Sequence, residues 1–178
     1  MKIIALLRNP AERTIADLTF RELFLVRRGS KKLQSNEIYA NKFKDILVNS
    51  TTGKVNSEDV VIRTSQYARQ LTEWLKYFNR SQVMLIDSEK FKDDPVPILQ
   101  EVEDFLEVQP ALTEEMFTYN KEKGFYCYIV EGDTVCMSPI KGAKHPEMDP
   151  KVMKKLKDYF KPWNEKLFKL VNTTFNWL

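Results

Sequence analysis

The chain has 178 residues, with 28 Lys and Arg against 25 Asp and Glu, so its formal net charge is only +3. Its hydrophobic fraction of 43% is enough to build a core, and we expect a single domain over residues 1–178. Abundant aromatic residues, only 5 glycines and no fixed-period repeat exclude a disordered chain, a collagen-like fibre and a coiled coil. The small net charge does not by itself indicate nucleic-acid binding, and no apolar run is long enough to span a bilayer.

The first apolar run, residues 2–7, predicts a buried strand. Asn9 and the residues after it predict a helix to about Val26, with Asn9 as its cap, a proline in the first turn and Glu12 at the capping-box position. Arg8 therefore stands where a strand ends and a helix begins, a place where an anion meets a guanidinium together with backbone N–H groups. The alternative is an arginine paired with a nearby carboxylate.

Four further segments follow in the first two-thirds of the chain. Residues 27–57 predict loops with a short helix at 36–47, and residues 57–78 predict one long amphipathic helix whose aromatic residues enter the core. Residues 82–87 predict a second strand, followed by a helix that opens at Asp94. The order strand, helix, strand, helix predicts an α/β fold, a parallel sheet with flanking crossover helices.

The two cysteines lie in a predicted hairpin at 125–137, which follows a short helix expected near 113–119. If residues 131–132 form a two-residue loop, Cys127 falls directly opposite Cys136. Two alternatives stay open there: a disulfide, which would fit an oxidising lumen or exterior, and two buried free thiols.

The last part of the chain predicts a helical region that begins after Asp149 and is interrupted at Pro162. Its apolar residues recur at helical spacing and should pack inward, while its many lysines face solvent.

One loop combines a glycine with cations. Gly142 permits close backbone approach, and Lys141 and Lys144 supply charge toward a phosphate-rich ligand. His145 is the only histidine, which excludes a multi-histidine metal site, and its alternative role is a loop imidazole bonded to backbone. The cysteines also lack the spacing of zinc ligands, so we expect no metal. No Gly-rich loop ends in Gly-Lys-Ser/Thr, the pattern of a phosphate-binding loop.

Three glycosylation acceptor sequences begin at Asn49, Asn79 and Asn172, whereas the composition would give roughly one by chance. Together with the cysteine pair they favour a secretory location.

Four segments, read together and in order, carry a family resemblance. They are Lys-Ile-Ile-Ala-Leu-Leu-Arg-Asn-Pro-Ala-Glu-Arg from Lys2, Lys-Gly-Phe-Tyr-Cys from Lys123, Lys-Gly-Ala-Lys-His-Pro from Lys141, and Phe-Lys-Pro-Trp-Asn-Glu-Lys-Leu-Phe from Phe160. The sequence resembles the heparan sulfate sulfotransferases, most of all the glucosamine 3-O-sulfotransferases. The resemblance implies a P-loop-NTPase-like parallel sheet with flanking helices and a C-terminal disulfide hairpin. It also implies sulfuryl transfer from 3′-phosphoadenylyl sulfate to heparan sulfate in the Golgi lumen.

The resemblance assigns roles to residues that match the family pattern. Arg8 matches the arginine that holds the donor's 3′-phosphate, Tyr126 matches a donor-contacting tyrosine, and Cys127 with Cys136 matches the family disulfide. Lys141, Gly142, Ala143, Lys144 and His145 fall in the donor loop. Two departures should weaken donor binding: Ala16 replaces a family serine, and Ala143 replaces an arginine.

Relative to the family, the chain begins at the strand that precedes Arg8. We therefore expect the N-terminal P-loop part, the catalytic glutamate and any membrane anchor to be absent, and no catalytic residue is identified. An uncovered strand at residues 2–7 should then promote self-association. Three functions remain open. The chain is either a sulfotransferase, as a fragment of an active enzyme or as a shortened and inactive relative, or a noncatalytic module that binds anionic polysaccharide or adenosine bisphosphate, or a plain structural domain.

Overall fold

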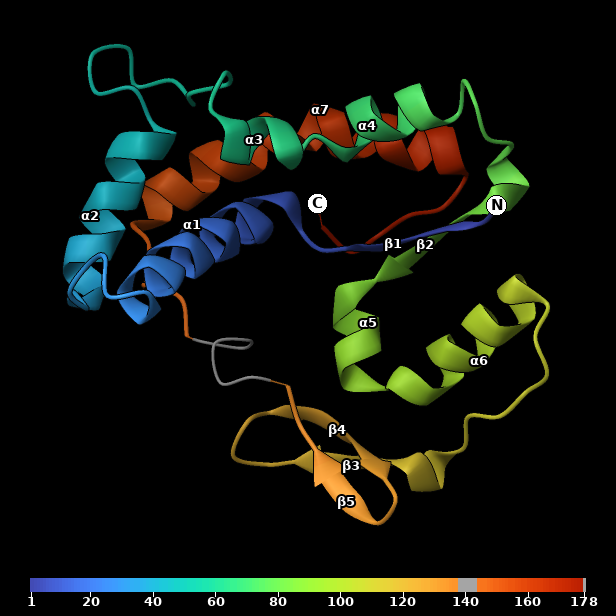
Figure 1. Ribbon diagram of the computed structural model, residues 1–178. Helices are drawn as coiled ribbons and strands as arrows, with labels where there is room; N and C mark the ends of the chain where they lie inside the picture. Colours follow the sequence, from blue (N-terminus) through green and yellow to red (C-terminus); the bar gives the residue numbers. More distant parts are fainter. Residues whose placement is uncertain (138–143, 178) are drawn as a thin grey trace. The chain divides into compact units, whose positions relative to one another are not determined.

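The computed structural model describes residues 1–137 and 144–177 (Figure 1). The chain divides into two compact units. The sheet unit contains residues 1–8 and the described residues from Phe78 to Met137, and the helical unit contains residues 9–77 and 144–177.

The sheet unit is built on two parallel strands, as the sequence predicts, but the first strand is not buried as expected, because Ile4 and Leu6 are 41% and 55% exposed. β1 (Ile3–Leu7) pairs with β2 (Val83–Asp87), in a register that runs from Ile3 opposite Val83 to Leu7 opposite Asp87. A 3₁₀ turn, η1 (Arg80–Gln82), precedes β2, and α5 (Ser88–Asp93) and α6 (Pro95–Leu106) follow it. The sequence predicts α6 but not α5.

A second sheet of three antiparallel strands completes the sheet unit: β3 (Phe117–Asn120), β4 (Phe125–Val130) and β5 (Asp133–Val135). The β4–β5 register, with Tyr128 opposite Val135, confirms the predicted hairpin. The predicted helix at 113–119 is wrong, because only one 3₁₀ turn, η2 (Glu114–Met116), forms before residues 117–120 pair with β4.

The helical unit contains α1 (Pro10–Arg27), α2 (Asn36–Leu47), α3 (Val60–Thr64), α4 (Tyr67–Trp74) and α7 (Pro150–Val171). α1 begins where predicted, since the side-chain oxygen of Asn9 accepts a 3.0 Å hydrogen bond from the backbone N–H of Ala11. The core of the helical unit includes Phe43, Ile62 and Phe160, which are fully buried.

Two predictions for the helical unit need correction. Residues 57–78 form two short helices rather than one, because the buried Ser65 and Gln66 between them make tertiary polar contacts, including a 2.7 Å hydrogen bond from Gln66 Nε2 to the Tyr159 hydroxyl. As a result Trp74 is 38% exposed instead of lying in the core. α7 also runs unbroken through Pro162.

The continuity of α7 has a physical cause in its apolar stripe. Leu156 and Phe160 before Pro162, and Leu167 after it, are all buried. Packing on both sides of the proline therefore offsets the helical hydrogen bond that a residue without an N–H cannot make. No helix in the described ranges combines the length and apolar composition that membrane crossing requires.

Candidate functional site

Arg8 follows the carboxyl end of β1, next to the point where Leu7 pairs with Asp87. Its side chain is 32% exposed, and its Nε lies 3.3 Å from Oε1 of Glu89 in the first turn of α5. Of the two alternatives that the sequence leaves open, pairing with a carboxylate is thus present. Any anion that binds Arg8 must compete with Glu89.

α5 begins directly at the end of β2 because Asp87 is its cap. The Asp87 carboxylate accepts a 2.9 Å hydrogen bond from the backbone N–H of Glu89. This cap fixes the first turn of the helix, and with it Glu89, beside the end of β1.

Tyr126 lies on β4 and faces Tyr119 on β3, with the two rings edge to face at a centroid distance of 5.2 Å. Together with Gly124, Lys92 and Asp93 they line a hollow of about 350 Å³. Lys92 and Asp93 belong to the last turn of α5.

α5 therefore links the two predicted binding residues of the sheet unit. Its first turn contacts Arg8 through Glu89, and its last turn lines the hollow beside Tyr126. The rise from Glu89 to Lys92 is only about 4.5 Å. Arg8 thus lies beside one end of this short helix, and Lys92 with two tyrosine rings lies at the other end. A guanidinium, an ammonium group and aromatic rings are the groups that suit a ligand with both an aromatic base and phosphate groups. Sequence reasoning missed Glu89, Lys92 and Tyr119, because it missed α5 and β3.

The remaining predicted donor-loop residues are untested. Lys141, Gly142 and Ala143 lie outside the described residues. Lys144 is exposed and His145 half-buried, and both belong to the helical unit, whereas Arg8 and Tyr126 belong to the sheet unit. Their roles in donor binding stay predictions.

Cys127 and Cys136 form a disulfide with their Cα atoms 4.5 Å apart, as the hairpin register predicts. This result removes the alternative of two free thiols. The acceptor asparagines Asn49, Asn79 and Asn172 are all exposed.

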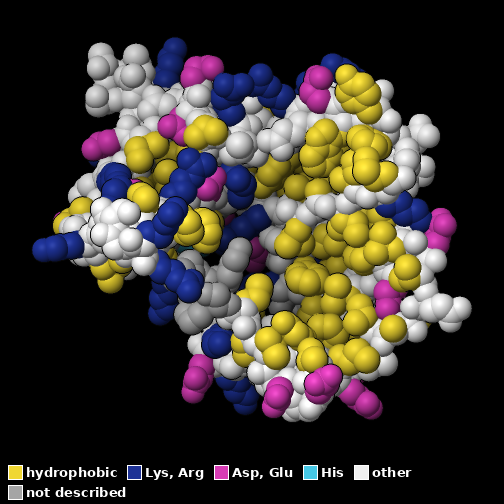
Figure 2. Space-filling model, viewed as in Figure 1, with side chains coloured by type: hydrophobic (Ala, Val, Ile, Leu, Met, Phe, Trp, Pro, Cys, Tyr) yellow, Lys and Arg dark blue, Asp and Glu magenta, His cyan; other side chains and the backbone are white. Residues whose placement is uncertain are grey.

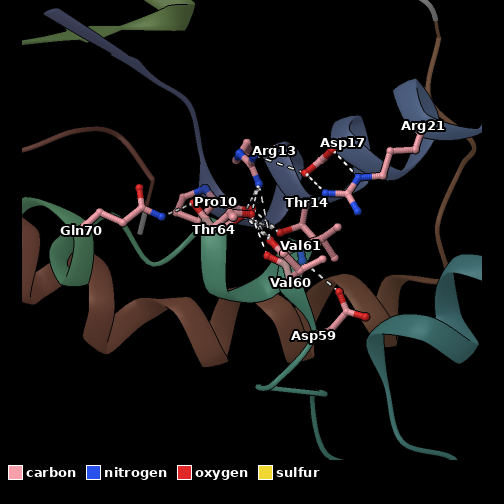
Figure 3. Close-up of polar contacts among 11 residues, drawn as sticks. Pro10, Arg13, Thr14, Asp17, Arg21, Asp59, Val60, Val61, Thr64 and Gln70 are labelled. Carbon is pink, nitrogen blue, oxygen red and sulfur yellow. Dashed lines mark hydrogen bonds and ion pairs between the residues drawn. The ribbon is translucent and has the colours of Figure 1, made fainter. Parts of the chain in front are cut away.

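A partly buried polar cluster in the helical unit joins α1 to α3 (Figure 3). Arg13 Nη1 donates to Thr64 Oγ1 at 2.9 Å and to Ser65 Oγ at 3.1 Å, and its Nη2 lies 3.3 Å from Asp17. The Thr14 and Ser65 hydroxyls, both fully buried, lie 3.0 Å apart. Because its polar groups satisfy one another, this cluster stabilises helix packing and receives no catalytic role here. In the described part of the chain, no three His, Cys, Asp or Glu side chains gather as metal ligands would.

Known proteins resemble this chain over nearly its whole length. The model of the sulfotransferase domain family matches residues 1–171. Human heparan sulfate glucosamine 3-O-sulfotransferase 5 is 34% identical over 99% of this chain and 49% of its own length. The human 3-O-sulfotransferase 3B1 is 31% identical over 99% of this chain and 43% of its own length. The chain thus spans about half the length of the curated relatives it matches.

Among solved structures, a sulfotransferase from Alicyclobacillus acidocaldarius superposes with a TM-score of 0.55 at 23% identity, over 98% of this chain and 56% of that one. At that identity the likeness shows the fold alone, a mixed α/β sulfotransferase fold with a parallel sheet and flanking helices. The fold, the family match and the curated relatives lead to one conclusion: the chain belongs to the sulfotransferase domain family, and the resemblance to the heparan sulfate 3-O-sulfotransferases is confirmed.

Proposed function

We propose that this chain takes part in the transfer of a sulfuryl group from 3′-phosphoadenylyl sulfate to a glucosamine hydroxyl of heparan sulfate, and that its described residues serve donor binding. The observation that carries the proposal is the similarity to heparan sulfate 3-O-sulfotransferases over 99% of the chain. The donor is a co-substrate that supplies the sulfuryl group.

In this proposal Arg8 binds the 3′-phosphate of the donor, since a guanidinium at a strand end forms charge-assisted hydrogen bonds with phosphate oxygens. Tyr126 and Tyr119 line the hollow that would receive the nucleotide base, and Lys92 adds a cation at its edge. The loop from Lys141 to His145 is proposed as a further part of the donor site.

The chemical step needs a base for the acceptor hydroxyl and cations for the charge that develops on the bridging oxygen. Two carboxylates could be considered for the base. Asp87 caps α5, and Glu73 is an exposed residue that pairs with Lys76 at 2.7 Å. Neither contact marks an activated base, so we assign donor binding to this chain and no catalytic base.

The donor assignment can be tested by calorimetry with 3′-phosphoadenosine 5′-phosphate. Arg8→Ala should weaken binding at least tenfold, because it removes the phosphate contact. Glu89→Gln should strengthen binding, because the carboxylate that competes for Arg8 is gone. Arg21→Ala is the matched control, since it removes the same charge from an exposed arginine that pairs with Asp17. Unchanged affinity in Arg8→Ala would overturn the assignment.

Transfer of labelled sulfate to heparan sulfate should be measured with this chain and with a version extended to the length of its relatives. Transfer by the extended protein supports the enzymatic proposal. Heparin binding without nucleotide binding or transfer in either protein would support the noncatalytic module instead.

A Golgi or other secretory location is part of the proposal. It is supported by the disulfide and by the exposure of Asn49, Asn79 and Asn172. When the protein is expressed through the secretory pathway, an endoglycosidase should lower its mass, and single Asn→Gln variants should identify the sites in use. An unchanged mass would contradict glycosylation.

A further inference from the structure

A groove of about 670 Å³ runs along one face of α7 in the helical unit. Its lining residues on α7 follow the helical repeat, so one continuous stripe of the helix forms the wall: Pro150, Met153, Lys154, Lys157, Asp158 and Lys161. Asn9 and Glu12 from the start of α1 and the C-terminal Asn176 and Trp177 complete the lining. Of the predicted donor residues that the structure describes, Arg8, Tyr126, Lys144 and His145, none lines this groove.

The lysines of the stripe are only partly neutralised. Lys154 pairs with Asp158 at 2.7 Å. Lys157 and Lys161 are exposed and make no hydrogen bond or ion pair with any residue that the structure describes. Glu12 is the other acid in the lining, so cations outnumber acids in the groove.

The spacing of the three lysines selects the shape of the ligand. They recur about once per helical turn, so Lys154 and Lys161 are separated by about 10 Å along the helix axis. A compact anion such as one phosphate cannot contact cations spread over that length. A linear polymer with an anionic group every few ångströms can, and its binding releases counterions from several charges at once.

The rest of the groove supplies apolar surface. Met153 is half-buried on α7, and the Trp177 ring is only 6% exposed and stacks on Phe175 at a centroid distance of 4.4 Å. The indole Nε1 of Trp177 has no hydrogen-bond partner within the described ranges. Trp177 therefore belongs to the floor of the groove, and the half-buried thioether of Met153 is the apolar surface beside the cations. A small apolar surface next to cations suits a sugar chain, whose rings are apolar on their faces and carry charged substituents at their edges.

We propose that the α7 groove binds a sulfated and carboxylated polysaccharide chain, as an anchoring surface whose residues are not those proposed for the donor site. The proposal rests on the proposed function for the identity of the polysaccharide. It adds that the acceptor polymer is held by Lys154, Lys157 and Lys161 along a helix whose opposite stripe is core.

The test compares two double variants on the same helix by calorimetry with a heparin octasaccharide at two salt concentrations. Lys157→Gln with Lys161→Gln removes two cations from the groove, whereas Lys166→Gln with Lys169→Gln removes two exposed cations that do not line it. The groove variant should lose at least fivefold in affinity, with a shallower salt dependence, and the control should lose less than twofold. Equal losses would mean that net charge alone drives binding and would overturn the proposal.

Two further binding measurements identify the class of ligand. A single-stranded oligonucleotide of equal charge should bind more weakly than the octasaccharide and should be less affected by the groove variant. Equal binding with an equal loss would overturn the assignment to polysaccharide. Arg8→Ala should leave octasaccharide affinity unchanged, and the groove variant should leave 3′-phosphoadenosine 5′-phosphate affinity unchanged, so failure of the donor site and failure of the groove are distinguishable.

Discussion

The helical unit and the sheet unit differ in how completely they bury their apolar residues. In the helical unit Phe43, Leu47 and Leu156 are all 0% exposed. In the sheet unit Ile4 and Leu6 on β1 are 41% and 55% exposed, and Figure 2 shows exposed hydrophobic side chains over the β1–β2 strands and α6. Parallel strands are normally covered on both faces, and a two-stranded sheet is marginal alone. Stability therefore resides mainly in the helical unit, whereas Arg8 and Tyr126 lie in the less stable unit.

The largest expected effect comes from the core of the helical unit. Phe160→Ala should lower the free energy of unfolding by about 3–5 kcal/mol, because it opens a cavity beneath α7. Tyr77→Ala, at a side chain that is 82% exposed, is the control and should change it by less than about 0.5 kcal/mol. Denaturant unfolding measures both, and hydrogen exchange at β1 and β2 would show whether the sheet unit opens at the same time. A loss below 1 kcal/mol would contradict this account of the core.

In the sheet unit the disulfide should be the largest single contribution. Replacing Cys127 and Cys136 by alanine should cost about 2–3 kcal/mol through the greater freedom of the unfolded loop. Thermal unfolding with and without reductant measures the effect: reductant should destabilise the unaltered protein and leave the variant unchanged. Equal stability in all four samples would mean that the hairpin does not depend on its cross-link.

A single charge introduced on the exposed face of β1 tests whether this strand promotes self-association. The unaltered protein should associate with rising concentration through this strand, and Leu6→Lys should weaken the association at least tenfold, about 1.4 kcal/mol. Leu33→Lys adds the same charge at a 66% exposed leucine of the helical unit and should have little effect. Sedimentation velocity that shows a monomer at every concentration would refute the prediction.

The smallest effect is electrostatic and belongs to the helical unit. Burial alone would raise the pKa of Glu22, but hydrogen bonds from Lys42 at 2.6 Å and Lys31 at 3.2 Å lower it below its ordinary value. Its stabilising contribution is therefore present above the ordinary carboxyl pKa and is lost as pH falls through the lowered value. Glu22→Gln should cost about 1 kcal/mol at neutral pH.

Unfolding curves across pH check this prediction. The difference between Glu22→Gln and the unaltered protein should shrink under acidic conditions. A difference that persists at low pH would point to packing rather than charge.

Local sequence patterns predicted the helices and strands that are determined by residues close together in the sequence. Asn9 and the proline after it set the start of α1, and the turn at 131–132 set the register that joins Cys127 to Cys136. Arg8 was placed correctly at a strand end for the same reason.

The missed features depend on distant partners. α5 has one apolar residue, Phe91, and hence no periodic signal, although it positions Glu89 and Lys92. β3 becomes a strand by pairing with β4. The break at Ser65 depends on a contact with Thr14 across 51 positions, which no local window contains.

The pairing of Ile3 with Val83 has a consequence for biosynthesis. β1 emerges from the ribosome before β2, and roughly 4–16 s pass at 5–20 residues per second before this partner strand follows. During that interval β1, a short apolar segment, lacks β2 as a partner while α1 and α2 of the helical unit are being synthesised. Closing so long a loop is also slow. Nascent β1 is therefore the segment of this chain that we expect a chaperone to bind.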